Sequence, residues 1–159
     1  MKTILFVCTA NIARSPMAAA LFNKKMADMG LSNRCQAQSA GTWGRDGYPA
    51  AAESIQVMQE RGIDISSHRS REVRTEIISA AHLILTMERG HKEALQIEFP
   101  HKRDKIYSLT EMVGPGYDIA DPYGMGLQDF EETAAELETI IEKGVDEMLC
   151  RACPEYFKE

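Results

Sequence analysis

Apolar residues follow two patterns along the chain: short continuous runs, and longer stretches in which they recur every three or four positions. Short runs have the length of buried strands, and they cover residues 3–8, 34–39, 82–87 and 105–109. Helical spacing fills the segments between them. It predicts helices over residues 15–29, from Pro49 to Gly62, over 88–98 and over 129–150, with Thr75 capping a further short helix.

Strands that alternate with helices imply a parallel sheet covered by helices on both faces. We therefore predict an α/β fold: a three-layer α/β/α arrangement with a four-stranded parallel sheet, doubly wound in the Rossmann or flavodoxin-like manner. The 159 residues show no repeat and no linker, so residues 1–159 are expected to form a single domain. In such sheets ligands bind where the strands end, at the switch point in strand order.

The chain is acidic, with a formal net charge of −6. This charge disfavours broad binding to nucleic acid or to an anionic membrane, so any anion site must be a local basic pocket. The first apolar run is too short for a signal-peptide core, and no stretch is long enough to span a membrane. Four cysteines in a chain of this size do not form a disulfide framework, and we expect a cytoplasmic protein.

The first predicted strand ends at a cysteine, and a loop of sequence C-T-A-N-I-A-R-S connects it to the next helix. Backbone amides and the helix dipole at such a junction attract an anion. The same field favours the thiolate of Cys8, which is the nucleophilic form. Arg14 offers a planar fork of donors that suits phosphoryl oxygens. Cys8 alone would be interpreted as a buried core residue, but the whole loop predicts covalent phosphate chemistry.

A candidate acid for this chemistry lies in the long loop over residues 110–126. Asp121 precedes Pro122, which biases it toward an extended conformation, and Tyr123 follows as a candidate aromatic wall. An Asp-Pro pair is by itself a common turn, and Asp118 is a nearby competitor. Together with the cysteine loop, the pattern favours Asp121 as the group that protonates a leaving oxygen.

The two motifs together resemble the low-molecular-weight protein tyrosine phosphatases over nearly the full length of the chain, in a bacterial-type form. Further matches are S-A-G-T at 39–42, H-R-S-R-E-V at 68–73 and L-I-L-T-M-E at 83–88. The resemblance implies that Cys8 forms a phosphocysteine, that Arg14 binds the phosphate and that Asp121 is the general acid. It also implies a loop that binds phosphate through Thr9, Ala10, Asn11, Ile12, Ala13, Arg14 and Ser15.

Other positions have supporting roles in this resemblance. Ser15 would donate a hydrogen bond to the thiolate of Cys8. Asn11 would hold the loop in a left-handed conformation, braced by Ser39 and His68. The substrate's aromatic ring would lie against Ile12, Trp43 and Tyr123. The implied partner is a phosphotyrosine-containing protein, acted on by a monomer without a metal or cofactor.

The chain departs from the family pattern at two positions of the loop, and a third position bears on the choice of substrate. Ala10 stands where glycine is common, which would strain the backbone if φ is positive there. Ala13 replaces a second cysteine that protects the nucleophile in many members. Ile12 favours a flat aromatic ester, whereas phosphoarginine phosphatases of the same family tend to have threonine. Because residues 105–124 resemble the bacterial branch that includes those enzymes, phosphoarginine stays an alternative.

Three other functions compete with the phosphatase. Thiol-dependent arsenate reductases need two more cysteines after the third strand, and residues 80–98 contain none. A non-catalytic phosphate-binding module would keep the loop and Arg14 but would lose Cys8 or the acid, and this chain has both. A flavodoxin-like electron carrier needs no Cys–Arg pair. Cys150 and Cys153 form a C-x-x-C that we interpret as two small apolar residues on the last helix rather than a redox or metal site.

Overall fold

The computed structural model describes residues 1–157 and contains one sheet of four parallel strands. The strands are β1 (Lys2–Cys8), β2 (Cys35–Gly41), β3 (Leu83–Thr86) and β4 (Ile106–Ser108). They lie in the order β2-β1-β3-β4, so β1 has a neighbour on each side. Val7, for example, lies opposite both Ala40 of β2 and Thr86 of β3. The predicted parallel sheet is confirmed.

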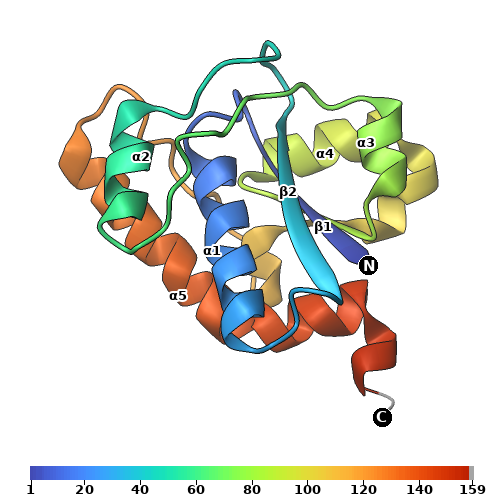
Figure 1. The fold of residues 1–159 in the computed structure, drawn as a ribbon. Coiled ribbons are helices and arrows are strands. Elements are labelled where there is room, and N and C mark those ends of the chain that lie inside the picture. Colours follow the sequence, from blue (N-terminus) through green and yellow to red (C-terminus); the bar gives the residue numbers. More distant parts are fainter. Residues whose placement is uncertain (158–159) are drawn as a thin grey trace.

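Two layers of helices cover the sheet. One layer holds α1 (Arg14–Asp28), α2 (Ala52–Gln59) and α5 (Leu127–Ala152), and the other holds α3 (Thr75–Ala80) and α4 (Arg89–Glu98). Figure 1 shows α1, α2 and α5 on one side of the strands, with α3 and α4 on the other. Short 3-10 turns lie at Pro100–Lys105, Leu109–Met112 and Pro154–Phe157. The three-layer architecture is therefore as the apolar pattern predicts, and no helix within residues 1–157 is long and apolar enough to cross a membrane.

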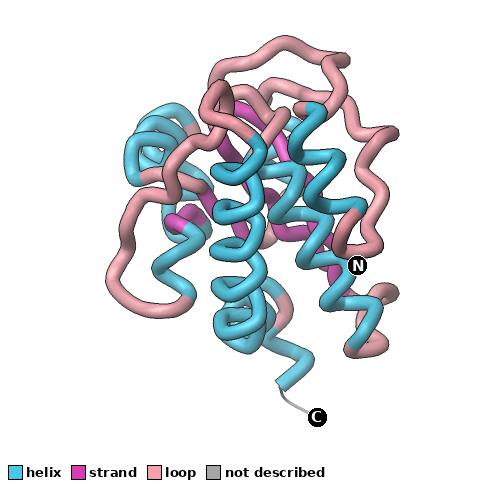
Figure 2. Tube along the Cα trace, turned by 90° about the vertical axis from the view of Figure 1, so that its left-hand side faces the viewer, coloured by secondary structure: helices cyan, strands magenta, loops and turns pink. Residues whose placement is uncertain are grey.

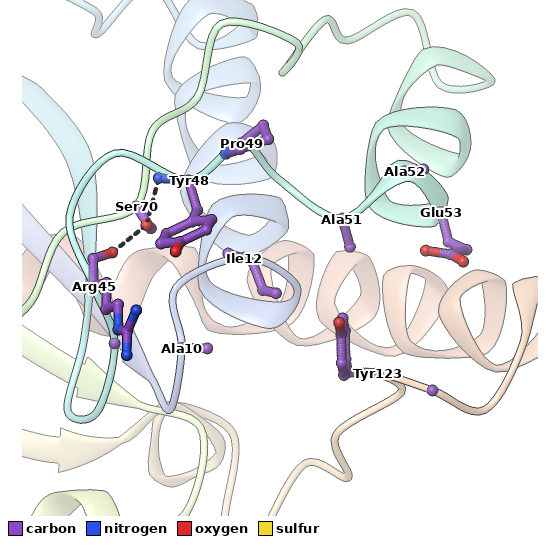
Figure 3. A pocket seen from close by; sticks show the side chains of 12 residues that line it. Ala10, Ile12, Arg45, Tyr48, Pro49, Ala51, Ala52, Glu53, Ser70 and Tyr123 are labelled. Carbon is purple, nitrogen blue, oxygen red and sulfur yellow. Dashed lines mark hydrogen bonds between the residues drawn. The ribbon is translucent and has the colours of Figure 1, made fainter.

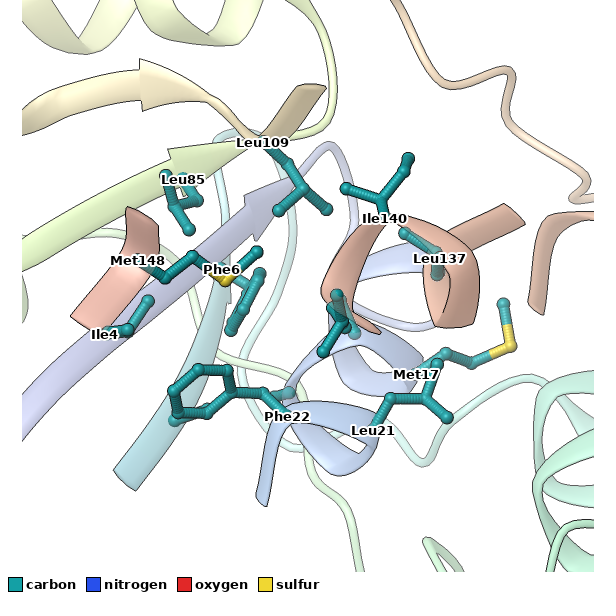
Figure 4. Close-up of a cluster of buried hydrophobic side chains, with 14 of the residues drawn as sticks. Ile4, Phe6, Met17, Leu21, Phe22, Leu85, Leu109, Leu137, Ile140 and Met148 are labelled. Atoms are coloured by element: carbon teal, nitrogen blue, oxygen red, sulfur yellow. The ribbon is translucent and has the colours of Figure 1, made fainter. Parts of the chain in front are cut away.

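The main core lies between the sheet and the layer of α1 and α5. Figure 4 shows Phe6 of β1 and Leu85 of β3 facing Phe22 of α1 and Leu137 of α5, all of them fully buried. A smaller cluster on the opposite face joins Leu5 and the other alternate strand residues to α3 and α4. Both faces of β1 are therefore buried, which is why its sequence is a continuous apolar run.

The chain order places a switch point between β1 and β3. From β1 the chain crosses to β2 over one face, and from β2 it crosses back past β1 to β3. The loops that leave β1 and β3 therefore diverge at the carboxyl end of the sheet and leave a crevice there. In Figure 2, which faces the layer of α1, α2 and α5, loops gather at the upper end of the molecule.

Several element bounds differ from the sequence-based ones by one to three residues. Helix α2 begins at Ala52 rather than Pro49, because Ala51 has a non-helical backbone and its amide donates to Ile12 O at 2.8 Å. Thr75 is the first residue of α3 rather than its cap. Cys150 lies in α5 and is exposed, whereas Cys153 follows the helix and is buried, so the two cysteines do not share one helical face.

Candidate active site

The loop over residues 9–13 connects β1 to α1 and encloses a cup at the switch point. The cup has a volume of about 290 Å³ and is lined by Cys8, Thr9, Ala10, Ile12, Ala13, Arg14, Asp121 and Tyr123. Its position is the one that the strand order favours for a ligand. All the residues that sequence reasoning placed in the catalytic step, Cys8, Arg14 and Asp121, therefore meet in one cavity although Asp121 is far from the others in sequence.

The carbonyls of the loop are bound by neighbouring segments. Cys8 O and Thr9 O accept from the amides of Thr42 and Trp43 at 2.9 Å each, and Ile12 O accepts from Ala51. No hydrogen bond described within residues 1–157 is donated by a backbone amide of residues 9–13. Most carbonyls of the loop are therefore occupied, whereas its backbone amides have no partner among residues 1–157, which is the arrangement that binds an anion.

Asn11 shapes the loop. Its φ of 59° makes it the one non-glycine residue within residues 1–157 with a left-handed backbone, as expected. Its side-chain Oδ1 accepts from the amide of Arg71 at 3.0 Å, and its carbonyl lies 2.7 Å from His68 Nε2. Burial lowers the pKa of His68, although this hydrogen bond opposes the shift, so the ring is neutral. Because a carbonyl oxygen can only accept, the ring donates to it from Nε2.

Ser39 contributes to this brace through its backbone rather than its side chain. Its carbonyl accepts from Arg71 Nε at 3.0 Å, so it acts on the loop only through Arg71. Ala10 does not meet the condition for strain: its φ is not positive, so alanine carries no left-handed backbone strain there. Gly41 is the residue for which close approach matters, because a Cβ on it would lie 2.5 Å from Thr9 O.

A chain of hydrogen bonds leads to the sulfur of Cys8. Asn11 Nδ2 donates to Ser15 Oγ at 2.8 Å, and Ser15 Oγ lies 2.9 Å from Cys8 Sγ. Because Ser15 Oγ accepts from Asn11, its own proton has two acceptors within reach, the sulfur at 2.9 Å and Ala40 O at 3.5 Å, and the sulfur is the nearer. All three residues are buried. The arrangement stabilises a negatively charged sulfur, which is the form that attacks phosphorus.

Arg14 is almost fully buried and is held by groups from three segments. Its Nη1 donates to Glu88 Oε2 and to Ile119 O, each at 2.7 Å, and its Nη2 lies 3.4 Å from Thr9 Oγ1. Its Nε is buried and has no hydrogen-bond partner among residues 1–157. Arg14 itself lines the cup, so its guanidinium places donors beside the space for a ligand oxygen.

Asp121 contributes to the lining of the cup from the loop before α5. Its Oδ2 lies 3.6 Å from Arg14 Nη2, and its Oδ1 accepts from the amide of Tyr123 at 3.1 Å. The competing Asp118 is bound elsewhere, since its Oδ1 accepts from the amide of Arg89 at 2.8 Å, at the first residue of α4. Asp121 is therefore the carboxyl group placed to reach a leaving oxygen in the cup.

Comparison with known proteins agrees with this arrangement of residues. The family model described as low molecular weight phosphotyrosine protein phosphatase matches residues 3–151. The chain belongs to this family. The phosphatase is also 41% identical over 146 residues to a probable low molecular weight protein-tyrosine-phosphatase, EpsP, of Ralstonia nicotianae, a match that covers 92% of each chain.

Solved structures show the same family with two different printed activities. A low molecular weight protein tyrosine phosphatase from T. tengcongensis has a TM-score of 0.87 and 41% identity, covering 92% of this phosphatase and 99% of that chain. The YwlE arginine phosphatase from Geobacillus stearothermophilus has a TM-score of 0.86 and 36% identity, covering 93% of each chain. Fold and family are therefore shared across a tyrosine enzyme and an arginine enzyme.

The structure adds residues that sequence reasoning missed. Glu88 and His91 lie beside Arg14, at the start of α4, because β3 is the neighbour of β1. Tyr48 lines the space beside the cup where Trp43 was expected, whereas Trp43 is 81% exposed and lines neither this space nor the cup. Figure 3 shows Tyr48 and Tyr123 on either side of Ile12. The one signal in the sequence that could have placed Glu88 at the site is its position directly after the third strand.

No group of three or more His, Cys, Asp and Glu side chains within residues 1–157 is arranged to hold a metal ion.

Proposed function

We propose that the protein hydrolyses phosphotyrosine in protein substrates through a phosphocysteine intermediate. The observation that carries this proposal is the cup at the switch point, whose lining brings together Cys8, Arg14 and Asp121. The family to which the chain belongs supports it. Each group has the chemistry that one step of ester hydrolysis requires.

In the first step the thiolate of Cys8 attacks phosphorus, and the bond from phosphorus to the tyrosine oxygen breaks. Asp121 gives its proton to that oxygen, so tyrosine leaves as the neutral phenol. Arg14 and the free loop amides bind the phosphoryl oxygens and the charge that grows on them. In the second step Asp121 takes a proton from water, the water oxygen attacks phosphorus, and the sulfur–phosphorus bond breaks to release phosphate.

The apolar lip of the cup supports an aromatic substrate. Ile12 and Tyr123 line the cup, and Tyr48 extends the same wall. A phenyl ring between these groups removes apolar surface from water. A guanidinium carries charge and several donors, and Ile12 offers it no acceptor. Phosphoarginine is nevertheless the second candidate, because a protein-arginine-phosphatase of Geobacillus stearothermophilus is 39% identical over 142 residues, covering 88% of this chain and 91% of that protein.

Hydrolysis of p-nitrophenyl phosphate by the wild type, Cys8→Ser, Asp121→Asn and Asp118→Asn tests the mechanism. We expect no turnover by Cys8→Ser and a loss of about 10²-fold or more in kcat for Asp121→Asn. Asp118→Asn is the matched control and should keep most of the activity, because Asp118 caps α4 outside the cup. Absence of wild-type turnover under reducing conditions, or equal losses in the two Asp variants, would refute the assignment.

The substrate is tested with one peptide sequence that contains either phosphotyrosine or phosphoarginine. We expect the higher kcat/KM for phosphotyrosine, and Ile12→Thr should shift the ratio toward phosphoarginine. A wild-type preference for phosphoarginine would favour the second candidate. We further propose that the enzyme acts as a monomer in the cytoplasm, where a reducing environment keeps the four free cysteines reduced.

A further inference from the structure

A second cavity opens beside the phosphate cup. It has a volume of about 640 Å³, and it shares Ala10, Ile12 and Tyr123 with the cup. Its own walls come from the loop after β2 and from the start of α2. A peptide that places its phosphorylated side chain in the cup can therefore extend its neighbouring residues into this cavity.

The wall formed by the loop after β2 is held in place by Ser70. Ser70 Oγ donates to Arg45 O at 2.5 Å and accepts from the amide of Tyr48 at 3.0 Å. Its backbone amide and carbonyl bind Tyr48 O at 2.7 Å and the Gly47 amide at 2.8 Å. Ser70 is itself buried. Four hydrogen bonds to one buried residue make this loop a fixed wall.

Two opposite charges lie at the ends of the cavity. Figure 3 shows Arg45 at one end and Glu53, in the first turn of α2, at the other, with Ile12 and Tyr48 between them. Neither charged side chain has an ion pair or hydrogen-bond partner among those described within residues 1–157. Glu53 is half-buried, so its unpaired carboxylate lies beside an apolar surface.

The neighbouring arginines differ from Arg45 in this respect. Arg69 donates to His68 O, Arg71 donates to Gln38 Oε1, and Arg74 forms an ion pair with Asp46. Each of them therefore has a structural partner. Among the arginines that flank the site, Arg45 is the one that lines the cavity. Its guanidinium has no ion-pair or hydrogen-bond partner among residues 1–157.

We propose that this cavity binds the residues that flank the phosphorylated side chain of a protein substrate, with Arg45 selecting an acidic side chain and Glu53 a basic one. The apolar middle, formed by Ile12, Tyr48 and Ala51, takes the aliphatic part of the peptide. This inference rests on the proposed phosphatase function and adds a charge preference to it. Charge complementarity at an interface acts on selectivity more than on the chemical step.

The test compares kcat/KM of phosphotyrosine peptides with Asp or Lys flanks against kcat/KM of p-nitrophenyl phosphate. We expect Arg45→Glu to lower kcat/KM for Asp-flanked peptides about three- to ten-fold and to leave p-nitrophenyl phosphate within two-fold of the wild type. Glu53→Lys should lower kcat/KM for Lys-flanked peptides in the same way. Both effects should shrink in high salt, since the charges are partly exposed.

Arg103→Glu is the matched control, because it makes the same charge change in the exposed turn at Pro100–Lys105, before β4. If Arg45→Glu and Glu53→Lys change peptide selectivity no more than Arg103→Glu does, the inference is refuted while the phosphatase function stands. Failure of the wild type to hydrolyse p-nitrophenyl phosphate would instead refute the function itself. Normal p-nitrophenyl phosphate turnover also shows that each variant is folded.

Discussion

His91 Nε2 lies 2.9 Å from Thr9 Oγ1 and so links helix α4 to the phosphate loop. Arg14 Nη2 lies 3.4 Å from the same hydroxyl and directs its protons toward it, so the hydroxyl of Thr9 points its own proton at His91. A neutral ring that accepts this proton at Nε2 carries its own proton on Nδ1, which is buried and has no hydrogen-bond partner among residues 1–157. Burial lowers the pKa of His91, while the nearby carboxylates of Glu88, Asp118 and Asp121 oppose this effect and Arg14 adds to it.

We expect His91→Ala to lower kcat/KM about five-fold, the equivalent of one hydrogen bond worth about 1 kcal/mol. His91→Gln, which can still reach Thr9 Oγ1, should recover part of the loss. Protonation of His91 would turn Nε2 into a donor that competes with Arg14 for Glu88, 3.6 Å away. The wild-type advantage over His91→Gln should therefore shrink as the pH falls. A constant ratio across pH would contradict this role.

Asn11 combines a left-handed backbone with bonds to Ser15 and Arg71. Asn11→Gly keeps the backbone free to adopt φ of 59° but removes the side-chain bonds. Asn11→Ala removes the side-chain bonds and also strains the left-handed backbone. We therefore expect it to be about 1 kcal/mol less stable than Asn11→Gly. Urea denaturation of the two variants measures this difference. Equal midpoints and equal m-values would show that the backbone conformation contributes nothing.

Gly41 ends β2 directly against the backbone of Thr9 and Ala10. Gly41→Ala places a Cβ about 2.5 Å from Thr9 O, which the phosphate loop must move to accommodate. We expect a loss of about 1–3 kcal/mol of unfolding free energy and a lower kcat. Gly90→Ala is the control, because a Cβ there meets nothing within 4 Å. If the two alanine variants are equally active and stable, the close approach is unimportant.

The free energy of unfolding should fall as the pH is lowered through the range in which the histidines titrate. Burial lowers the pKa of both His68 and His91 in the folded protein. Near and below the ordinary value of about 6.5 the unfolded chain then binds more protons than the folded protein, so the unfolding free energy rises with pH there. Chemical denaturation between pH 5 and 7 tests this, and His68→Gln should flatten the slope. Equal slopes would show that His68 does not contribute.

Among residues 1–157, Cys8 is the one cysteine that lines the cup. Cys35 opposes Lys2 at the far end of β1, and its pKa is raised by burial and by the nearby Cys153, so Cys153 lies at that end too. We expect peroxide to oxidise Cys8 beyond the sulfenic acid, with little activity recovered by a thiol. Ala13→Cys, which adds a thiol in the lining of the cup, should make the loss reversible. Full recovery of the wild type after peroxide would contradict this expectation.

Local sequence determined the parts of this protein that depend on neighbours in the chain. The apolar runs gave the strands because a strand buried on both faces must be apolar throughout. The segment from Cys8 to Ser15 predicted the cup because strand, loop and helix start follow one another directly. Asn11 predicted its own left-handed conformation, since few other residues adopt it.

Tertiary structure decided what depends on residues far apart in sequence. Glu88 and His91 reach Arg14 and Thr9 because β3 lies beside β1, an adjacency that no local pattern specifies. Tyr48 rather than Trp43 forms the wall because Ser70 fixes the loop after β2. The same packing leaves Arg45 without a partner while Arg71 and Arg74 are bound. Charge and aromatic character are visible in a sequence, but their direction and partners are set only when distant segments pack together.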